Sequence, residues 1–396
     1  MSLPSAMKQQ KTGQTGMRTL NTLYFYLTEG CNLACRHCWM GPRFDATGNR
    51  YPTLPVELFE TAIREARPLG LSGVKLTGGE PLLHPHFTRL LQIVRREELK
   101  LIIETNGLLC TPEIAAEIAK SPDRFVSVSI DGADAETHEW VRGVPGSFNA
   151  ARQAVNNLVA AGIRPQLIFT VMRRNAGQVD AIVRMAEELG AGSVKFNVVQ
   201  PTARGEKLHK VQATLNIADL IALGRHVEQE LAPRTKLKLF ILYPQAFRAL
   251  HRIASGDGCG VCGIFGILGV IASGHYALCG MGEQVPDLVF GEVGKDLLEV
   301  VWREHTVLKA LREGLPERLE GVCSRCLMKQ RCRGSCVAQN YYRKGSLWAP
   351  NWFCEQAEEA GLFPTSRLGT RPAQSSNQLS RCGDESSLNE YAPERV

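Results

Sequence analysis

Apolar residues follow two different periods between about residues 20 and 200. Six short runs rich in β-branched and aromatic residues predict strands, at 23–28, 73–77, 101–105, 125–131, 167–171 and 194–199. Between them, apolar residues recur at helical spacing, as at 56–66, 112–119, 148–162 and 179–190. Strands that alternate with helices build a parallel sheet covered by helices, so we expect an α/β fold, either an open doubly wound sheet or a partial barrel. Functional residues should then lie at the carboxyl ends of the strands.

The pattern changes near residue 250. A further helix at 216–231 and an apolar run at 237–242 are expected to complete a first domain, 20–250. The next segment, 251–364, is rich in glycine and holds eight of the thirteen cysteines, which predicts a second, small cysteine-rich domain. We expect a flexible N-terminus over 1–19 and a disordered tail over 365–396, where Ser, Arg, Asn and Glu predominate.

Charge and cysteine content narrow the classes of function. The 46 Lys and Arg against 40 Asp and Glu give a net charge of +6 without basic runs, which argues against a nucleic-acid partner. The first residues carry no secretion signal, and the longest apolar run, at 261–272, has 12 residues where a membrane helix needs about 20. We therefore expect a cytoplasmic protein without a membrane partner. Clustered cysteines in a reducing compartment indicate metal binding rather than disulfides.

Three cysteines form a C-x3-C-x2-C motif directly after the first predicted strand: Cys31, Cys35 and Cys38. Three thiolates leave one iron of a four-iron cluster without a protein ligand. A structural zinc site would need a fourth ligand, and only His37 lies nearby in the sequence. After the second predicted strand, Gly78 and Gly79 allow a close backbone approach, and Glu80 offers a carboxylate to an ammonium group. By itself, such a Gly-Gly-Glu segment is usually only a turn.

Together these motifs resemble the radical S-adenosylmethionine (SAM) superfamily, which implies a partial (β/α)6 TIM-like barrel. In that family SAM chelates the open iron, and its reductive cleavage yields a 5′-deoxyadenosyl radical that abstracts hydrogen from an unactivated C–H bond. The resemblance implies further SAM contacts: His37 near the adenine, Ser129 and Asp131 at the ribose and methionine ends, and Arg142 on the carboxylate. The alternative for His37 is an ordinary solvent-facing loop histidine, and for the other three side chains it is turn capping or a surface ion pair.

The C-terminal cysteines are spaced C-x2-C-x11-G-x4-C, then C-x2-C-x5-C-x3-C, then a final cysteine. This spacing resembles the SPASM extension, which carries two auxiliary four-iron clusters. The resemblance implies one cluster on Cys259, Cys262, Cys279 and Cys336, and another on Cys323, Cys326, Cys332 and Cys354. The close spacing of Cys259 and Cys262 leaves open whether both ligate one cluster, and a pair of zinc ribbons is the alternative. The implied cofactors are three [4Fe–4S] clusters and SAM.

SPASM enzymes mostly modify ribosomally made peptides, by crosslinking, side-chain oxidation or backbone excision, so we expect a peptide maturase. The alternatives are an anaerobic sulfatase-maturating enzyme, disfavoured because the motif reads Cys35-Arg36-His37-Cys38-Trp39, a maturase of a modified haem, and a non-enzymatic iron–sulfur or zinc module. Because Cys31 leaves no room for a preceding leader-recognition domain, we expect a precursor peptide delivered by a separate small protein, and flavodoxin or ferredoxin as the reductant. No residue stands out as a general base.

Overall fold

The computed structural model describes residues 18–45, 51–255 and 262–369. Ten strands form one curved sheet in the order β12-β11-β10-β1-β4-β5-β6-β7-β8-β9, and β2 pairs with β3 in a separate ribbon. The strands are β1 Thr22–Tyr26, β2 Gly30–Cys31, β3 Arg43–Phe44, β4 Gly73–Thr77, β5 Lys100–Thr105, β6 Arg124–Ser129, β7 Gln166–Val171, β8 Ser193–Val198, β9 Lys238–Ile241, β10 Ile267–Val270, β11 His275–Ala277 and β12 Val289–Glu292.

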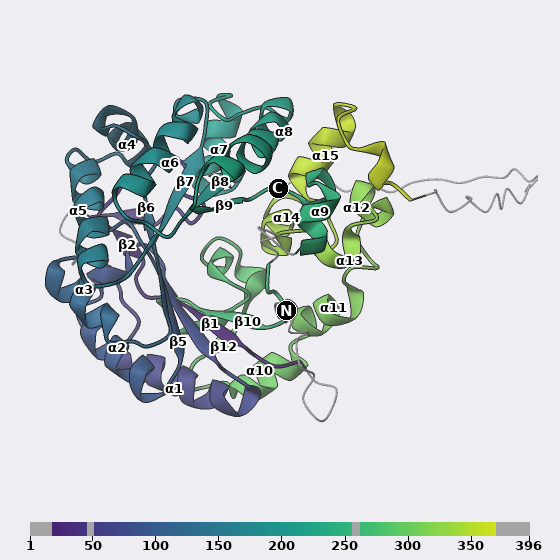
Figure 1. The fold of residues 1–396 in the computed structure, drawn as a ribbon. Coiled ribbons are helices and arrows are strands. Elements are labelled where there is room, and N and C mark those ends of the chain that lie inside the picture. Colours follow the sequence, from purple (N-terminus) through teal and green to yellow (C-terminus); the bar gives the residue numbers. More distant parts are fainter. Residues whose placement is uncertain (1–17, 46–50, 256–261, 370–396) are drawn as a thin grey trace, which may run out of the picture.

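Helices lie on the outer side of this sheet and gather near its open side (Figure 1). They are α1 Val56–Ala66, α2 Phe87–Arg96, α3 Pro112–Ala119, α4 Ala135–Arg142, α5 Ser147–Ala160, α6 Val179–Glu188, α7 Ala203–Lys210, α8 Ile217–Arg225, α9 Leu250–Ser255, α10 Leu298–Glu304, α11 Thr306–Gly314, α12 Gly321–Arg325, α13 Lys329–Cys332, α14 Val337–Lys344 and α15 Trp352–Glu359. None of the helices in the described ranges is long and apolar enough to cross a membrane.

The predicted α/β class with a parallel-dominated sheet is confirmed, and the sheet is larger than the six predicted strands. Strands β1 and β4 to β9 run parallel, with registers such as Leu23 opposite Val74. On the other side of β1, β10 also pairs parallel, and β11 and β12 continue antiparallel. The sheet thus extends beyond the first predicted domain, because β10, β11 and β12 come from the 251–364 segment.

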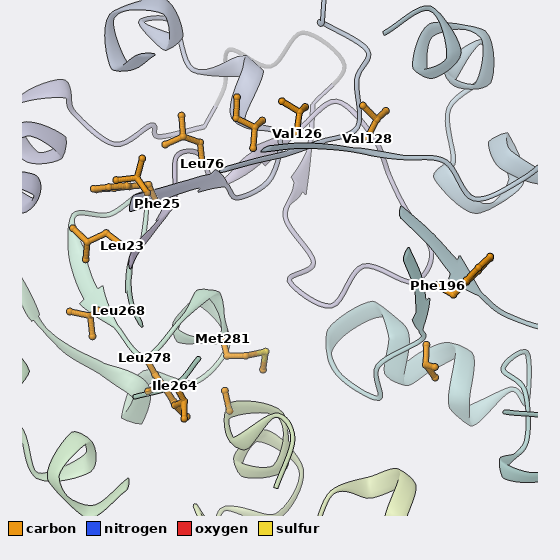
Figure 2. Close-up of a cluster of buried hydrophobic side chains, with 14 of the residues drawn as sticks. Leu23, Phe25, Leu76, Val126, Val128, Phe196, Ile264, Leu268, Leu278 and Met281 are labelled. Carbon is orange, nitrogen blue, oxygen red and sulfur yellow. The ribbon is translucent and has the colours of Figure 1, made fainter. Parts of the chain in front are cut away.

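Alternation along the strands separates an outer apolar face from an inner polar one. On β1, Leu23 and Phe25 are fully buried against the helices. Figure 2 labels these two with Leu76, Val126, Val128 and Phe196 from three further parallel strands, all members of one buried cluster. Since successive side chains point to opposite faces of a strand, the residues between them face the inside of the curved sheet.

The ends of the chain need one correction. Residues 365–369, assigned from the sequence to a disordered tail, are ordered. Leu368 bridges to Cys326, and the Arg367 guanidinium donates to the carbonyl oxygens of Ala246 and Arg248. Composition alone missed these contacts, because they join segments far apart in the sequence, more than a hundred residues apart for the two hydrogen bonds of Arg367. The rest of the predicted flexible ends, apart from residues 18 and 19, lies outside the described residues.

Candidate active site

A cavity of about 520 Å³ occupies the inner side of the sheet. Its walls come from alternate residues of the parallel strands, which face inward for the reason given above: Lys75 and Thr77, Glu104, Ser129, Ile168 and Thr170, and Lys195 and Asn197. Loops at the carboxyl ends of β1, β4 and β5 line the cavity too, and α14 and α15 contribute Gln339 and Trp352. The C-terminal segment therefore helps to enclose a site whose other walls belong to the N-terminal strands.

All three cysteines of the C-x3-C-x2-C motif line this cavity. Nitrogen donors surround two of their sulfurs: the Leu33 amide lies 3.4 Å and Asn106 Nδ2 3.9 Å from Cys31 Sγ, and Arg142 Nη1 lies 3.6 Å from Cys35 Sγ. Burial raises the pKa of the Cys31 thiol, so a positively charged centre is needed to hold it as thiolate. Donors aimed at sulfur are typical of the surroundings of iron–sulfur ligands.

The Gly78-Gly79-Glu80 segment lines the same cavity. Gly79 packs so tightly on the cysteine loop that a Cβ there would lie 1.8 Å from the Gly30 carbonyl oxygen. The buried Glu80 carboxylate accepts hydrogen bonds from Thr105 Oγ1 (2.6 Å), the Leu82 amide (3.0 Å) and the Asn106 amide (2.8 Å). Two of these reach Oε1 and one reaches Oε2. Because each carboxylate oxygen has two acceptor positions, Oε2 keeps one for a further donor.

Arg142 reaches the cavity from the last residue of α4. Its Nη2 lies 2.7 Å from Asp131 Oδ2, and its Nε has no hydrogen-bond partner among the described residues. Asp131, which the sequence suggested as a SAM contact, is fully buried, is not on the cavity wall, and accepts a hydrogen bond from the Thr170 amide (2.7 Å). The structure thus places Asp131 behind Arg142, and only Ser129 of this predicted pair faces the cavity.

His37 also lines the cavity, with Nε2 3.5 Å from Asp131 Oδ2. Burial lowers the pKa of His37 to about 4, helped by Arg142 and opposed by Asp131. The ring is therefore neutral at pH 7, and its Nδ1 has no hydrogen-bond partner among the described residues. A neutral ring with a bare edge can stack or hydrogen-bond to an uncharged heterocycle.

Sequence reasoning missed the charged residues inside the barrel. Lys75 Nζ lies 2.7 Å from Glu104 Oε2 across β4 and β5, and Lys195 on β8 interacts electrostatically with the same carboxylate. Burial raises the pKa of Glu104, but Lys75 and then Lys195 overcome this and lower it below its ordinary value. The signal was present, because each of these side chains interrupts a predicted apolar strand at an inward position.

The C-terminal cysteines fall into two places. Cys262, Cys279 and Cys336 line the large cavity, whereas Cys323, Cys326, Cys332 and Cys354 line a small second cavity. Cys259 lies outside the described residues. Within the described ranges no three His, Cys, Asp or Glu side chains are gathered closely enough to hold a single metal ion.

Comparison with known proteins now decides the family. The sequence pattern of the Radical SAM superfamily matches residues 25–186. The chain is 30% identical over 339 residues to the AdoMet-dependent heme synthase of Methanosarcina barkeri, covering 83% of this chain and 94% of that protein. It is 30% identical over 362 residues to mycofactocin maturase MftC of Mycobacterium ulcerans, covering 88% of this chain and 92% of that protein. The chain belongs to the radical SAM superfamily.

The fold agrees with this membership. Streptococcus suis SuiB bound to its precursor peptide SuiA superposes with a TM-score of 0.69 at 18% identity, over 86% of this chain and 77% of SuiB. The enzyme anSMEcpe with bound AdoMet and a peptide gives a TM-score of 0.64 at 19% identity, over 86% of this chain and 95% of its own. The chain therefore has the fold of SPASM-type radical SAM enzymes.

Family membership implies a [4Fe–4S] cluster and SAM, and the residues present fit both. Three thiols face one cavity, with nitrogen donors to two of their sulfurs and no fourth protein ligand supplied by the motif. Beside them lie the unpartnered Arg142 Nε and the spare acceptor position of Glu80, which suit the carboxylate and ammonium groups of an amino acid.

Proposed function

We propose that this radical SAM enzyme is a peptide maturase that forms a crosslink, oxidises a side chain or excises a backbone fragment in a ribosomally made peptide. The observation that carries the proposal is the common cavity: the three-cysteine loop and Cys262, Cys279 and Cys336 line the same space. A substrate there would lie between two redox centres. The similarity to MftC over 88% of the chain supports a peptide as that substrate.

In the proposed complex, this chain's own residues hold SAM by its amino-acid end. Glu80 accepts from the ammonium group at the free position of Oε2, and Arg142 donates to the carboxylate. Asp131 positions Arg142 rather than contacting SAM, because it pairs with Nη2 from behind the cavity wall. His37 lies against the adenine and Ser129 faces the ribose. Gly78 and Gly79 let their segment pack closely on the neighbouring backbone, which holds Glu80 beside the cysteine loop.

The bound cluster and SAM would supply a carbon radical that abstracts a hydrogen atom from the substrate. The chain's part is to exclude water and to orient the target bond. Trp352 and Phe353, both buried, close the cavity on the side of the C-terminal segment. Met281 and Leu242 add apolar surface to the same wall.

The eight C-terminal cysteines are proposed to hold two auxiliary [4Fe–4S] clusters. Cys259 joins Cys262, Cys279 and Cys336 on the first, and Cys323, Cys326, Cys332 and Cys354 hold the second. The two cavities support this division of the described cysteines. In an oxidative reaction the auxiliary clusters would take an electron from the substrate and pass it to an external electron carrier. Flavodoxin or ferredoxin would be the reductant that supplies the electron for SAM cleavage, in a reducing cytoplasm. A separate small protein would present the precursor peptide. In this proposal the domain 20–250 holds the SAM-binding cluster, and the domain 251–364 holds the two auxiliary clusters.

The decisive experiment is anaerobic co-expression of the enzyme with each short peptide encoded beside its gene and any small neighbouring protein, followed by intact mass measurement. A loss of two hydrogens identifies a crosslink or dehydrogenation, and a larger loss identifies excision. Peptides left unchanged in every combination would contradict a peptide maturase. Omitting the small neighbouring protein tests its part separately.

A modified-haem maturase is the second candidate, because the heme synthase of Methanosarcina barkeri is as similar to this chain as MftC is. One assay distinguishes a modified-haem maturase from a peptide maturase. Reduced enzyme and SAM are incubated with an iron porphyrin that carries carboxylate side chains, and the porphyrin mass is measured. A change of porphyrin mass with unchanged peptides would favour the haem reading over the peptide reading.

A further inference from the structure

Lys195 differs from Lys75 and Arg142, which also line the cavity, in having no carboxylate within ion-pairing distance among the described residues. Arg204 has none among them either, but its guanidinium donates to the carbonyl oxygens of Cys35 and Pro42. Lys75 and Arg142 each have one, Glu104 at 2.7 Å and Asp131 at 2.7 Å. Lys195 lines the cavity from β8. Its electrostatic interaction with Glu104 is with a carboxylate that already pairs with Lys75. Burial lowers the pKa of Lys195, and Lys75 adds to this, so its charge is incompletely compensated.

The cysteines do not account for this charge. Lys75 interacts electrostatically with Cys262, and its positive charge lowers the pKa of Cys279 too. The positive charge of Lys75 is therefore balanced by Glu104 and also acts on the nearby thiols of Cys262 and Cys279. Glu104 and Lys75 are the charged groups that act on Lys195, and no cysteine of the described chain is among them. Among the described lysines that line the inner strands, Lys195 is thus the one without a carboxylate of its own.

Asn197 stands two residues further along β8, on the same inward face. Its Oδ1 is buried, and no group of the described chain donates to it. An amide presents both a donor and an acceptor, and a buried amide oxygen without a partner costs free energy. The Lys195 ammonium and Asn197 Nδ2 can both donate to a planar anion, and the free Oδ1 can accept from an N–H or O–H group beside that anion.

The rest of the cavity suggests which anion fits. Met281, Leu242, Trp352 and Phe353 line the same space with apolar surface. The Lys195 ammonium carries one charge, and at neutral pH a carboxylate also carries one whereas a phosphate monoester carries nearly two. An apolar body with one carboxylate is therefore the chemistry that this cavity complements.

We propose that Lys195 and Asn197 bind a carboxylate of the substrate and so fix which C–H bond faces the SAM site. The inference rests on the proposed function, since it assigns a subsite of the same cavity. The carboxylate is the C-terminus of a peptide, an acidic side chain, or the propionate-type arm of a tetrapyrrole. All three share the group that Lys195 and Asn197 recognise, and the test below separates them.

The test is binding without turnover. Anaerobically reconstituted holoenzyme, saturated with SAM and given no reductant, is titrated by calorimetry with N-acetylglycylphenylalanine and with its C-terminal amide. The further probes are N-acetylglycylglutamic acid α-amide and 3-phenylpropionate, each compared with the amide of its carboxylate, and inorganic phosphate. We expect one class of carboxylate to bind about tenfold more tightly than its uncharged partner, as a charge-assisted contact in a cavity allows.

Variants assign the preference to the two residues. Lys195→Met keeps the aliphatic stem and should abolish the preference for acid over amide, Lys195→Arg should retain most of it, and Asn197→Ala should lose part. The matched control is Lys238→Ala, an exposed lysine on the neighbouring strand β9. Equal binding of acids and amides, absence of carboxylate binding, tighter binding of phosphate, or a preference that survives in Lys195→Met would each overturn the subsite.

The outcome is independent of the peptide assay. A carboxylate preference in a protein that modifies no peptide would contradict the peptide maturase and leave the subsite standing. A modified peptide together with equal binding of acids and amides would support the peptide maturase and contradict the carboxylate subsite. Preference for the free C-terminus, for the glutamate probe or for phenylpropionate identifies the source of the carboxylate.

Discussion

The carboxylate of Asp131 and the guanidinium of Arg142 form a buried ion pair, with Oδ2 2.7 Å from Nη2. Asp131 is completely buried, and its second oxygen accepts from the Thr170 amide. The pair therefore fixes Arg142 from behind, with Nη1 directed at Cys35 Sγ. Such a pair orients a cation without using the face that meets the ligand.

Asp131→Asn should disturb Arg142 while preserving shape. A buried arginine that loses its carboxylate costs about 3–5 kcal/mol of stability, and SAM should bind about tenfold more weakly. Urea unfolding and equilibrium dialysis with labelled SAM measure the two effects. Asp123→Asn, whose side chain is 66% exposed beside Lys100, is the control and should change neither. An Asp131→Asn enzyme with unaltered SAM affinity would contradict the positioning role.

A histidine far from the cavity predicts a pH dependence of stability. His226 Nε2 lies 2.9 Å from Asp180 Oδ2 and its Nδ1 lies 3.0 Å from Glu230 Oε2. Burial lowers the pKa of His226, but the two carboxylates outweigh it and raise the pKa above its ordinary value. A raised pKa means stabilisation that is fully present below about pH 6.5 and disappears as pH rises through the folded value.

The measurement is the free energy of unfolding at about pH 6 and about pH 9. Since both partners are partly exposed, the difference attributable to His226 should be at most about 1 kcal/mol. His226→Gln should remove that part of the pH dependence, whereas His251→Gln, at an exposed histidine of α9, should leave it unchanged. A stability that rises with pH in the native chain but not in His226→Gln would reverse the sign and contradict the argument.

The contact between Gly79 and the cysteine loop gives a third prediction. In Gly79→Ala the new methyl group meets the Gly30 carbonyl oxygen at 1.8 Å, so the backbone beside Cys31 must move. We expect lower iron content and loss of SAM cleavage, because the displaced backbone moves Cys31 relative to the other two thiols of the motif. Gly177→Ala is the matched control, since nothing lies within 4 Å of its Cβ position. Iron analysis and 5′-deoxyadenosine assay compare the two, and a Gly79→Ala enzyme with full iron and activity would disprove the constraint.

The parallel strands could be predicted from the sequence because their signal is local. All six predicted runs are strands, with ends that differ by at most two residues. Strands β9 and β10 were not predicted from the sequence, since each has only four residues. In addition, β10 lies in a segment that is rich in glycine and cysteine, where the strand pattern is weak. The parallel pairing of β10 with β1 joins positions such as Leu23 and Leu268, which no local pattern reports.

The same distinction holds for the site. Cys31, Cys35, Cys38 and the Gly-Gly-Glu segment are contiguous motifs, so their common location followed from their places after two strands. Asp131 was assigned as a SAM contact from the family resemblance, yet its side chain turns toward Arg142 and Thr170. Lys75 and Lys195 could have been found by asking why a lysine stands inside an apolar run. Which of the two keeps a carboxylate depends on Glu104, and only the fold settles that.

The proposed cluster ligands predict separable losses of activity. Cys35→Ala should abolish 5′-deoxyadenosine formation, because the SAM-binding cluster loses one of its three thiolates. Cys326→Ala should leave SAM cleavage largely intact and lower product formation, since Cys326 lines the second cavity rather than the first. Anaerobic assays with dithionite as reductant measure both quantities on the same sample.

Cys110→Ala is the control variant, because it removes a buried thiol that is not a proposed cluster ligand. Cys110 is 4% exposed, packs in the main apolar core and lines neither cavity, so its removal should cost stability without changing cleavage or product. Retained 5′-deoxyadenosine formation in Cys35→Ala would refute the assignment of the three-cysteine loop. Full product formation in Cys326→Ala would remove the second auxiliary cluster from the mechanism while leaving the SAM site as proposed. If Cys110→Ala lost 5′-deoxyadenosine formation to the same extent as Cys35→Ala, both losses would be explained by a destabilised fold. The iron content per chain would then show which variant still carries its clusters.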